Sequence, residues 1–173
     1  VVTSHRGSSA FNLSPFQGDE KDLSPVVSFS YDQEKLTPFS YSVYLDEQQT
    51  EVRFGLSHQS AMYEFDFSQH KPAYLILNSL NGGLKWDGEA VSGFQSIENN
   101  TRVYLYLKPE QTPEGISALK ETGLANETAV TGKNACVVLK FAKGIKTLRL
   151  RYGISFINET QARKNVDREI QNY

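Results

Sequence analysis

Tyr41-Ser42-Val43-Tyr44-Leu45 is followed by Val52-Arg53-Phe54-Gly55-Leu56 and then by Tyr63-Glu64-Phe65-Asp66-Phe67. In each run a large apolar side chain recurs at every second position, which is typical of a β-strand with one buried face. The linker Asp46–Gln49 has the length of a hairpin turn. We therefore predict that these strands pair as antiparallel neighbours.

More strands are predicted along the rest of the chain. They are expected at residues 73–77, 84–86, 89–95, 102–108, 134–142 and 146–156. The predicted turns between them are Asn81-Gly82-Gly83, Asp87-Gly88 and Lys143-Gly144, because Asn and Gly accept a positive φ at low cost.

Two helices are also predicted. Thr112-Pro113-Glu114 combines a capping residue, a proline at the first helical position and an early acid, and Gly123 would end that helix. Asn158-Glu159-Thr160-Gln161 has the pattern of a capping box and leads into an apolar stripe of Ala162, Val166 and Ile170.

Many short strands and few helices predict an all-β fold, an antiparallel two-sheet β-sandwich with a short C-terminal helix. A closed barrel is the alternative, because sequential hairpins fit both architectures. We assign residues 1–157 to the sandwich, with an irregular, loop-rich start at 1–25, and residues 158–173 to the helix. The chain begins without Met and stops at Tyr173 within the predicted helix, so we expect it to be a piece of a longer protein.

Composition excludes several classes of protein. The 173 residues suit one domain, and the net charge of −2, without a basic stripe, argues against nucleic acid as a partner. No apolar run approaches the roughly 20 residues of a membrane helix. Cys136 is the only cysteine, and its apolar surroundings predict a buried, inert thiol.

The sequence carries no recognisable catalytic motif, and its three histidines do not have the spacing of metal ligands. Ser14-Pro15-Phe16-Gln17-Gly18-Asp19 stands out because it places an aromatic ring, a glycine and an acid together. A ring can stack on the C–H face of a sugar while a carboxylate accepts from its hydroxyls. The alternative interpretation is that Phe16 anchors this loop to the core.

Three stretches resemble glycoside hydrolase family 92. Residues 153–170, which read GISFINETQARKNVDREI, resemble the segment that closes the family's N-terminal domain. Residues 28–45 resemble a second family run, and Ser14–Asp19 resembles the family's SPWMGD loop. The resemblance covers nearly the whole chain and is weakest in the middle.

This resemblance implies a secreted or periplasmic, calcium-dependent, inverting α-mannosidase that joins a β-sandwich to an (α/α)6 barrel. The acid, the base and the Ca²⁺ ligands of the family belong mainly to the barrel. We therefore expect no catalytic residue, metal ligand or cofactor in this chain. By the same resemblance Phe16 would be the aromatic wall of a pocket for an α-mannoside glycan, with Gly18 and Asp19 beside it and His5 nearby.

Three functions compete at this point. The first is a domain that shapes the sugar pocket next to the catalytic barrel and is inactive alone. The second is a stand-alone carbohydrate-binding module, using the Phe16 loop and the aromatic residues Trp86, Tyr104 and Tyr106 as surface contacts. The third is an interaction domain that binds protein instead of sugar.

Overall fold

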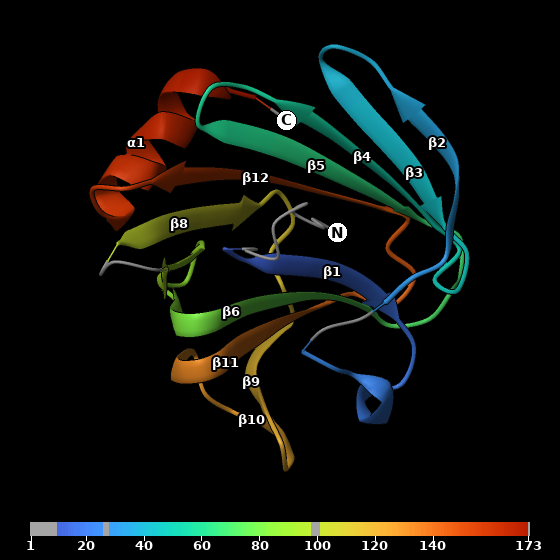
Figure 1. Cartoon of the computed structure of the whole chain (residues 1–173). Coiled ribbons are helices and arrows are strands. Elements are labelled where there is room, and N and C mark those ends of the chain that lie inside the picture. The colour runs from blue at the N-terminus through green and yellow to red at the C-terminus, as the bar shows by residue number, and fades with distance from the viewer. Residues whose placement is uncertain (1–9, 26–27, 98–100, 173) are drawn as a thin grey trace.

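The computed structural model describes residues 10–25, 28–97 and 101–172, which form twelve strands, one short 3₁₀ turn and one α-helix (Figure 1). The strands are β1 (Asn12–Gln17), β2 (Tyr31–Leu36), β3 (Ser40–Leu45), β4 (Thr50–Leu56), β5 (Ser60–Phe67), β6 (Ala73–Trp86), β7 (Val91–Ser96), β8 (Arg102–Pro109), β9 (Gly115–Lys120), β10 (Gly123–Ala125), β11 (Ala129–Phe141) and β12 (Thr147–Ser155). The 3₁₀ turn η1 spans Glu20–Asp22, and the helix α1 spans Glu159–Glu169.

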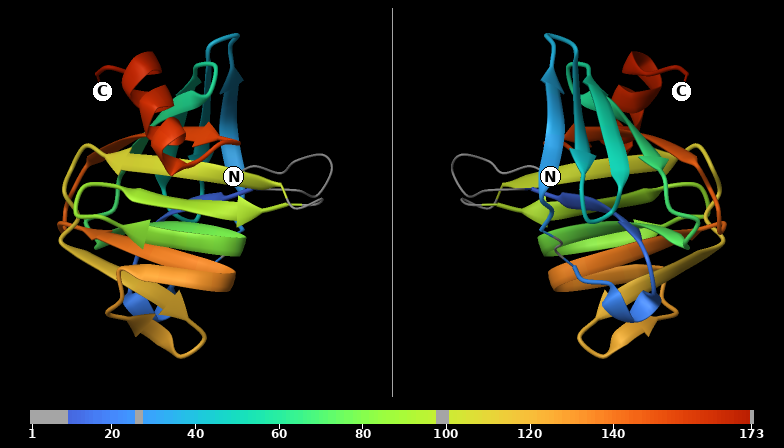
Figure 2. Two further views of the ribbon diagram at one scale, coloured as in Figure 1. Left: turned by 90° about the vertical axis from the view of Figure 1, so that its left-hand side faces the viewer. Right: turned by 90° about the vertical axis from the view of Figure 1, so that its right-hand side faces the viewer.

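The described strands pair in antiparallel fashion and form one continuous sheet in the order β10-β9-β11-β6-β7-β8-β12-β5-β4-β3-β2. The long strand β6 has two neighbours on one edge, because residues 73–78 pair with β1 and residues 82–86 pair with β7. The sheet curls over, so the layer of β3, β4, β5 and β12 faces the layer of β1, β6 and β11 (Figures 1 and 2). The predicted antiparallel β-sandwich with a short C-terminal helix is confirmed, and its two layers belong to the same sheet.

The main core lies between the layers, and the alternation in β3, β4 and β5 sets which residues enter it. Val43, Val52 and Phe65 are buried there against Leu77 and Val137 from the facing layer. Since side chains alternate across a strand, Tyr44, Glu51 and Asp66 lie on the outward face of the same three strands.

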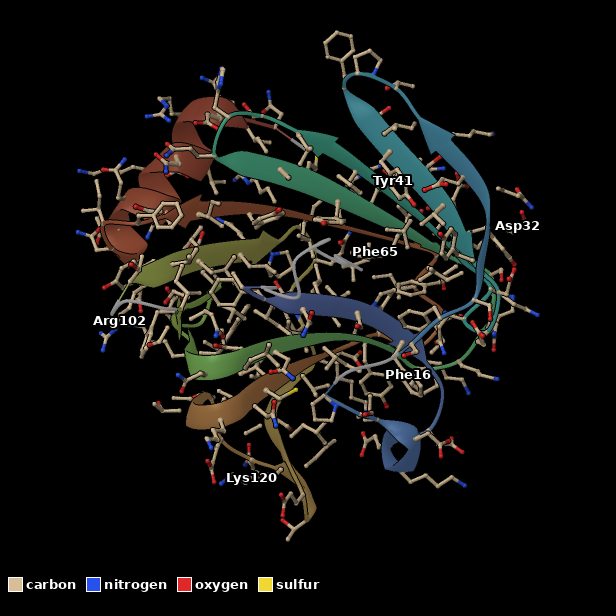
Figure 3. The ribbon with its side chains drawn as sticks, in the orientation of Figure 1. Phe16, Asp32, Tyr41, Phe65, Arg102 and Lys120 are labelled. Carbon is tan, nitrogen blue, oxygen red and sulfur yellow. The ribbon has the colours of Figure 1, made fainter. Side chains whose placement is uncertain are left out.

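A second core covers the other face of β6 and β11. Its buried members are Phe16, Tyr74, Ile76, Leu119, Cys136 and Val138. Figure 3 shows Phe65 between the two layers and Phe16 near the η1 end of the molecule. The predicted burial of Cys136 is confirmed, and burial raises the pKa of its thiol to about 12.

The C-terminal helix begins where the capping pattern predicts. Asn158 Oδ1 accepts a hydrogen bond of 2.8 Å from the backbone N–H of Gln161. Ala162 and Val166 are buried against Tyr106. The helix can approach β12 closely because Gly153 has no side chain, and a Cβ there would lie 2.6 Å from the carbonyl oxygen of Ala162.

The helix predicted between Thr112 and Gly123 is wrong. Residues 115–120 form β9, which pairs with β11, and residues 123–125 form β10. Ala118 and Leu119 are buried by this pairing. A free edge of β11 offers backbone partners and apolar contacts, and these outweigh a helix-start signal worth only a few tenths of a kcal/mol to about 1 kcal/mol.

Two further predictions fail near β6 and β1. Asn81-Gly82-Gly83 is not a turn but the interior of β6. Gly82 is needed there because the backbone of β7 lies so close that a Cβ would meet the carbonyl oxygen of Phe94 at 1.8 Å. The start at 1–25 is not irregular throughout, because residues 12–17 form β1 and continue the ladder of β6; residues 1–9 lie outside the described part.

Candidate functional site

The predicted sugar loop starts inside strand β1. Phe16 is the cross-strand partner of Tyr74, their ring centroids lie 6.1 Å apart, and Phe16 is only 7% exposed. Little of its ring face is therefore available to a sugar in this chain. The geometry fits the alternative interpretation, in which Phe16 anchors the loop to the second core.

Gly18 and Asp19 follow at the end of the strand. Gly18 has a φ of +156° and donates a hydrogen bond to the Pro72 carbonyl oxygen at 3.2 Å. Asp19 precedes η1 without capping it, and its side chain is 75% exposed with Lys21 at 3.8 Å. Its carboxylate is therefore the accessible acceptor of this loop. The fourth predicted residue, His5, lies outside the described residues.

Gln17 is a buried residue of this loop that sequence reasoning passed over. Its backbone N–H donates to Oε1 of Gln48 at 2.6 Å, and its side-chain amide exchanges two hydrogen bonds with the backbone of Gln69, at 2.9 and 3.2 Å. These bonds tie the end of β1 to the β3–β4 turn and to the loop after β5. A polar residue between Phe16 and Gly18 is the only signal of this role in the sequence.

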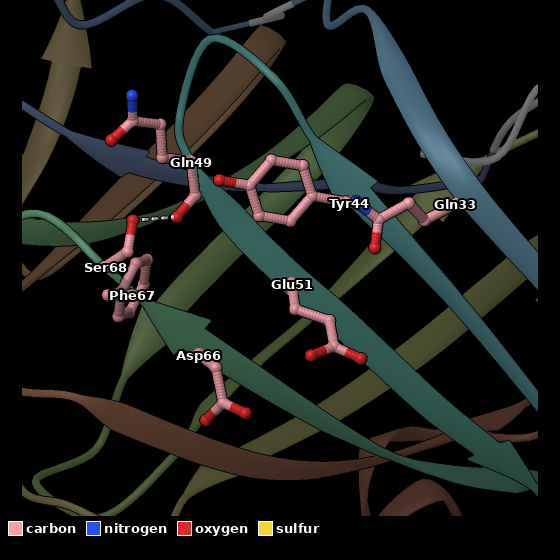
Figure 4. Close-up of a pocket in the computed structure, with 7 residues that line it drawn as sticks. All are labelled: Gln33, Tyr44, Gln49, Glu51, Asp66, Phe67 and Ser68. Atoms are coloured by element: carbon pink, nitrogen blue, oxygen red, sulfur yellow. Dashed lines mark hydrogen bonds between the residues drawn. The ribbon is translucent and has the colours of Figure 1, made fainter.

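Gln48 and Gln69 are followed or preceded in the sequence by Gln49 and Ser68, which line an open pocket of about 470 Å³. This pocket lies on the outward face of β3, β4 and β5 (Figure 4). We call it the outward pocket, and its lining residues are Gln33, Tyr44, Gln49, Glu51, Asp66, Phe67 and Ser68. The strand register places Tyr44 opposite Glu51, and Glu51 opposite Asp66. An aromatic ring and two carboxylates thus form one row across the sheet.

Irregular backbone builds the rim of the outward pocket. On β2 the register shifts between Asp32 and Lys35, so the strand carries an extra residue opposite β3, and Gln33 within this bulge has a φ of +54°. On the other side, Gln49 closes the β3–β4 turn with a φ of +46°, and Ser68 Oγ donates to its carbonyl oxygen at 2.6 Å. Gln33 and Gln49 therefore hold backbone conformations that favour glycine.

Two arginines pair with the carboxylates of this face. Arg53 contacts Glu51 at 3.0 Å and also binds Glu64 and Asp66, while Arg149 binds Glu64 from the next strand. Hydrogen bonds from Arg149 and Arg53 lower the pKa of Glu64 below its ordinary value. The acids of this cluster are consequently held in fixed positions as ion pairs.

This arrangement does not resemble the acid pair of a glycosidase, in which one carboxyl has a raised pKa so that it can donate a proton. Hydrogen bonds from lysine or arginine instead lower the pKa of Glu20, Glu64 and Glu89. Within the described ranges, no three His, Cys, Asp or Glu side chains are grouped as metal ligands. Those ranges also contain no helix long and apolar enough to cross a membrane.

The three aromatic residues predicted as surface contacts do not form an exposed platform. Tyr106 is buried under α1, with the Arg163 guanidinium 5.5 Å from its ring centroid, so that prediction is wrong for Tyr106. Tyr104 is half-buried with its ring centroid 6.4 Å from that of Phe94, and Trp86 packs against the main core. Tyr44 lines the pocket instead, and its outward position in the alternation was the signal for it.

A comparison with protein families matches residues 3–155 to the model described as the glycosyl hydrolase family 92 N-terminal domain. Among solved structures, the chain is similar to a family GH92 inverting mannosidase from Bacteroides thetaiotaomicron, with 23% identity and a TM-score of 0.80 over 94% of this chain. It is also similar to a family GH92 α-mannosidase from the same organism, with 16% identity and a TM-score of 0.80 over 91% of this chain.

The chain spans only about a quarter of these two solved proteins, 24% and 26% of their lengths. At these identities the structural likeness establishes the fold. No curated protein sequence matched the chain.

Proposed function

Because the chain belongs to glycoside hydrolase family 92, whose N-terminal domain it contains, we propose that it is the front β-sandwich domain of an α-mannosidase. The match of the family model over residues 3–155 is the observation that carries this proposal. The two similar solved structures are mannosidases, which supports an α-mannoside glycan as the substrate of the whole protein.

In this proposal the domain lends one wall to a sugar pocket at its interface with an (α/α)6 catalytic domain. Phe16, Gly18, Asp19 and His5 are the proposed subsite residues. The exposed carboxylate of Asp19 accepts hydrogen bonds from the sugar hydroxyls. Phe16 is buried beneath the loop and holds it in position. Gln17 ties the same loop to the β3–β4 turn and to the loop after β5, so the subsite is rigid before a sugar arrives.

The proposal places proton transfer in the catalytic domain, so this chain by itself does not hydrolyse mannosides. It also places Ca²⁺ there, because the described residues do not fit such an ion: Glu51 and Asp66 are bound by Arg53. A secreted or periplasmic location follows from the same family membership, since a glycan-degrading enzyme meets its substrate outside the cytoplasm.

Two measurements test the proposal. The purified chain, supplied with CaCl₂, is assayed on nitrophenyl α-mannoside and on mannobiose, with an intact family 92 mannosidase as the positive control. We expect no turnover by the chain, and metal-dependent turnover would contradict the proposal. Reading the coding sequence beyond Tyr173 is the second test: a helical domain with paired acids supports the proposal, and an immediate stop codon rejects it.

A further inference from the structure

We propose that the outward pocket binds one neutral pyranose unit of a glycan. This inference goes beyond the role of the domain next to a catalytic barrel and does not depend on it, because each of its contacts comes from this chain. The pocket volume of about 470 Å³ lies within the ordinary range for small ligands and is open to solvent on one side. An open pocket suits a sugar that remains attached to a longer chain.

The lining residues supply the two kinds of contact that a pyranose needs. Tyr44 places an aromatic ring on the sheet face, where the apolar C–H side of a sugar ring can pack. The side chain of Gln33 carries both a donor and an acceptor, which matches hydroxyl groups that also do both. Figure 4 shows Tyr44, Gln33 and the two acids on the same face of the sheet.

The ion pairs of the pocket favour a neutral ligand over a charged one. Glu51 and Asp66 retain lone pairs that can accept from hydroxyls, and Arg53, which also binds Glu64, compensates part of their negative charge. A bound cation would have to compete with that guanidinium for both carboxylates. An anionic ligand would face the same two carboxylates without a free cation among the residues that line the pocket.

Several polar groups of the pocket have no partner in the described part of the protein. There, the amides of Gln33 and Gln49 and the hydroxyl of Tyr44 make no hydrogen bond to another protein group, whereas Asp66 is oriented by Arg53 and by Thr147 Oγ1 at 2.7 Å. The pocket thus combines fixed acceptors with groups left available for a ligand.

The backbone conformation at the rim of the outward pocket also supports a binding site. Three non-glycine residues in the described ranges have a positive φ, and two of them, Gln33 and Gln49, line this pocket. Such conformations are unfavourable for glutamine and cluster at functional sites. Here they lie on opposite sides of Tyr44, on a bulge and on a turn, and Figure 4 shows the Gln33 side chain beside Tyr44.

The test is an amide NMR titration of the 173-residue chain with methyl α-mannopyranoside, and separately with methyl α-glucopyranoside. We expect saturating shifts at residues 33, 44, 49, 51 and 66 with at least one of the two sugars. Tyr44→Ala should weaken binding about tenfold or more, and Tyr44→Phe, which keeps the ring, should stay within about threefold of wild type. Gln33→Ala, a change on an exposed strand, should also weaken binding without affecting folding.

Tyr31→Ala is the matched control, because Tyr31 is an exposed tyrosine on the neighbouring strand β2 and does not line the pocket. It should leave the affinity unchanged. The proposal is overturned by an absence of saturating shifts, by shifts confined to the Ser14–Asp19 loop, or by a response to Ca²⁺ or glucuronate alone. None of these results bears on the mannosidase assay, so the two proposals fail separately.

Discussion

Gly18 lies directly against the ring of Phe16, so close that a Cβ at residue 18 would be 2.9 Å from Cζ of Phe16. A side chain at residue 18 would therefore force the ring of Phe16 to shift. Phe16 in turn is held by Tyr74 in the second core. This relationship links the conformation of the proposed sugar loop to the packing beneath it.

Gly18→Ala should lower the free energy of unfolding by about 2 kcal/mol, because it combines an unfavourable φ with a clash against Phe16. Gly88→Ala is the control, since Gly88 also has a positive φ but a Cβ added there would have no atom within 4 Å. The control should lose only about 1 kcal/mol. Urea unfolding measures both, and equal losses would show that the contact with Phe16 is unimportant.

Gly153→Val should displace α1 from the sheet. The added side chain would clash with the carbonyl oxygen of Ala162 and a methyl group of Val166. Ala162 and Val166 are the residues through which α1 packs against the sheet. We expect a loss of about 2–3 kcal/mol in unfolding free energy and faster hydrogen exchange in α1. Gly115→Ala, where the nearest atom is 3.9 Å away, should be close to neutral, and retained protection of α1 in Gly153→Val would contradict the prediction.

Cys136 should not react with thiol reagents in the native protein. Its side chain is fully buried, and burial raises the pKa of the thiol to about 12. At about pH 8 an exposed cysteine is partly ionised and reacts readily, so labelling should require unfolding. Labelling with and without urea measures this, and rapid stoichiometric modification of the folded chain would be inconsistent with the structure.

Glu64 should make stability depend on pH in the acidic range. Its pKa is lowered from 4.5 by Arg149 and Arg53, so its contribution is present above the unfolded pKa and is lost as the pH falls through the folded pKa. Glu64→Gln should cost about 1 kcal/mol at neutral pH, because the arginines are partly exposed, and nearly nothing in strong acid. Unfolding free energies of both proteins against pH measure this difference.

Glu121→Gln is the control for that series, since Glu121 is exposed and makes no ion pair with the described residues. Its unfolding free energy should follow that of the wild type at every pH. A difference between Glu64→Gln and wild type that grew as the pH fell would have the wrong sign for a carboxyl with a lowered pKa.

Local sequence patterns were sufficient to predict the strands with a clear alternation and the capped helix. In β3, β4 and β5 the side chains at every second position face the core as predicted, because one buried face imposes a period of two. Asn158 begins α1 because its capping bond is made within four residues. The family resemblance in residues 14–19, 28–45 and 153–170 also lies in the sequence, and the family model, which matches residues 3–155, confirms the family.

Which strand edges paired and which side chains became buried depended on contacts between distant segments. Residues 115–120 became a strand because β11 offered an edge, and Gly82 served close packing of β6 on β7 instead of a turn. The outward pocket joins Gln33, Tyr44, Gln49 and Asp66 from separate strands and turns, and Phe16 was buried by Tyr74, far away in sequence. Local patterns record the preferences of a segment, whereas pairing register and burial depend on segments that the chain brings together only when it folds.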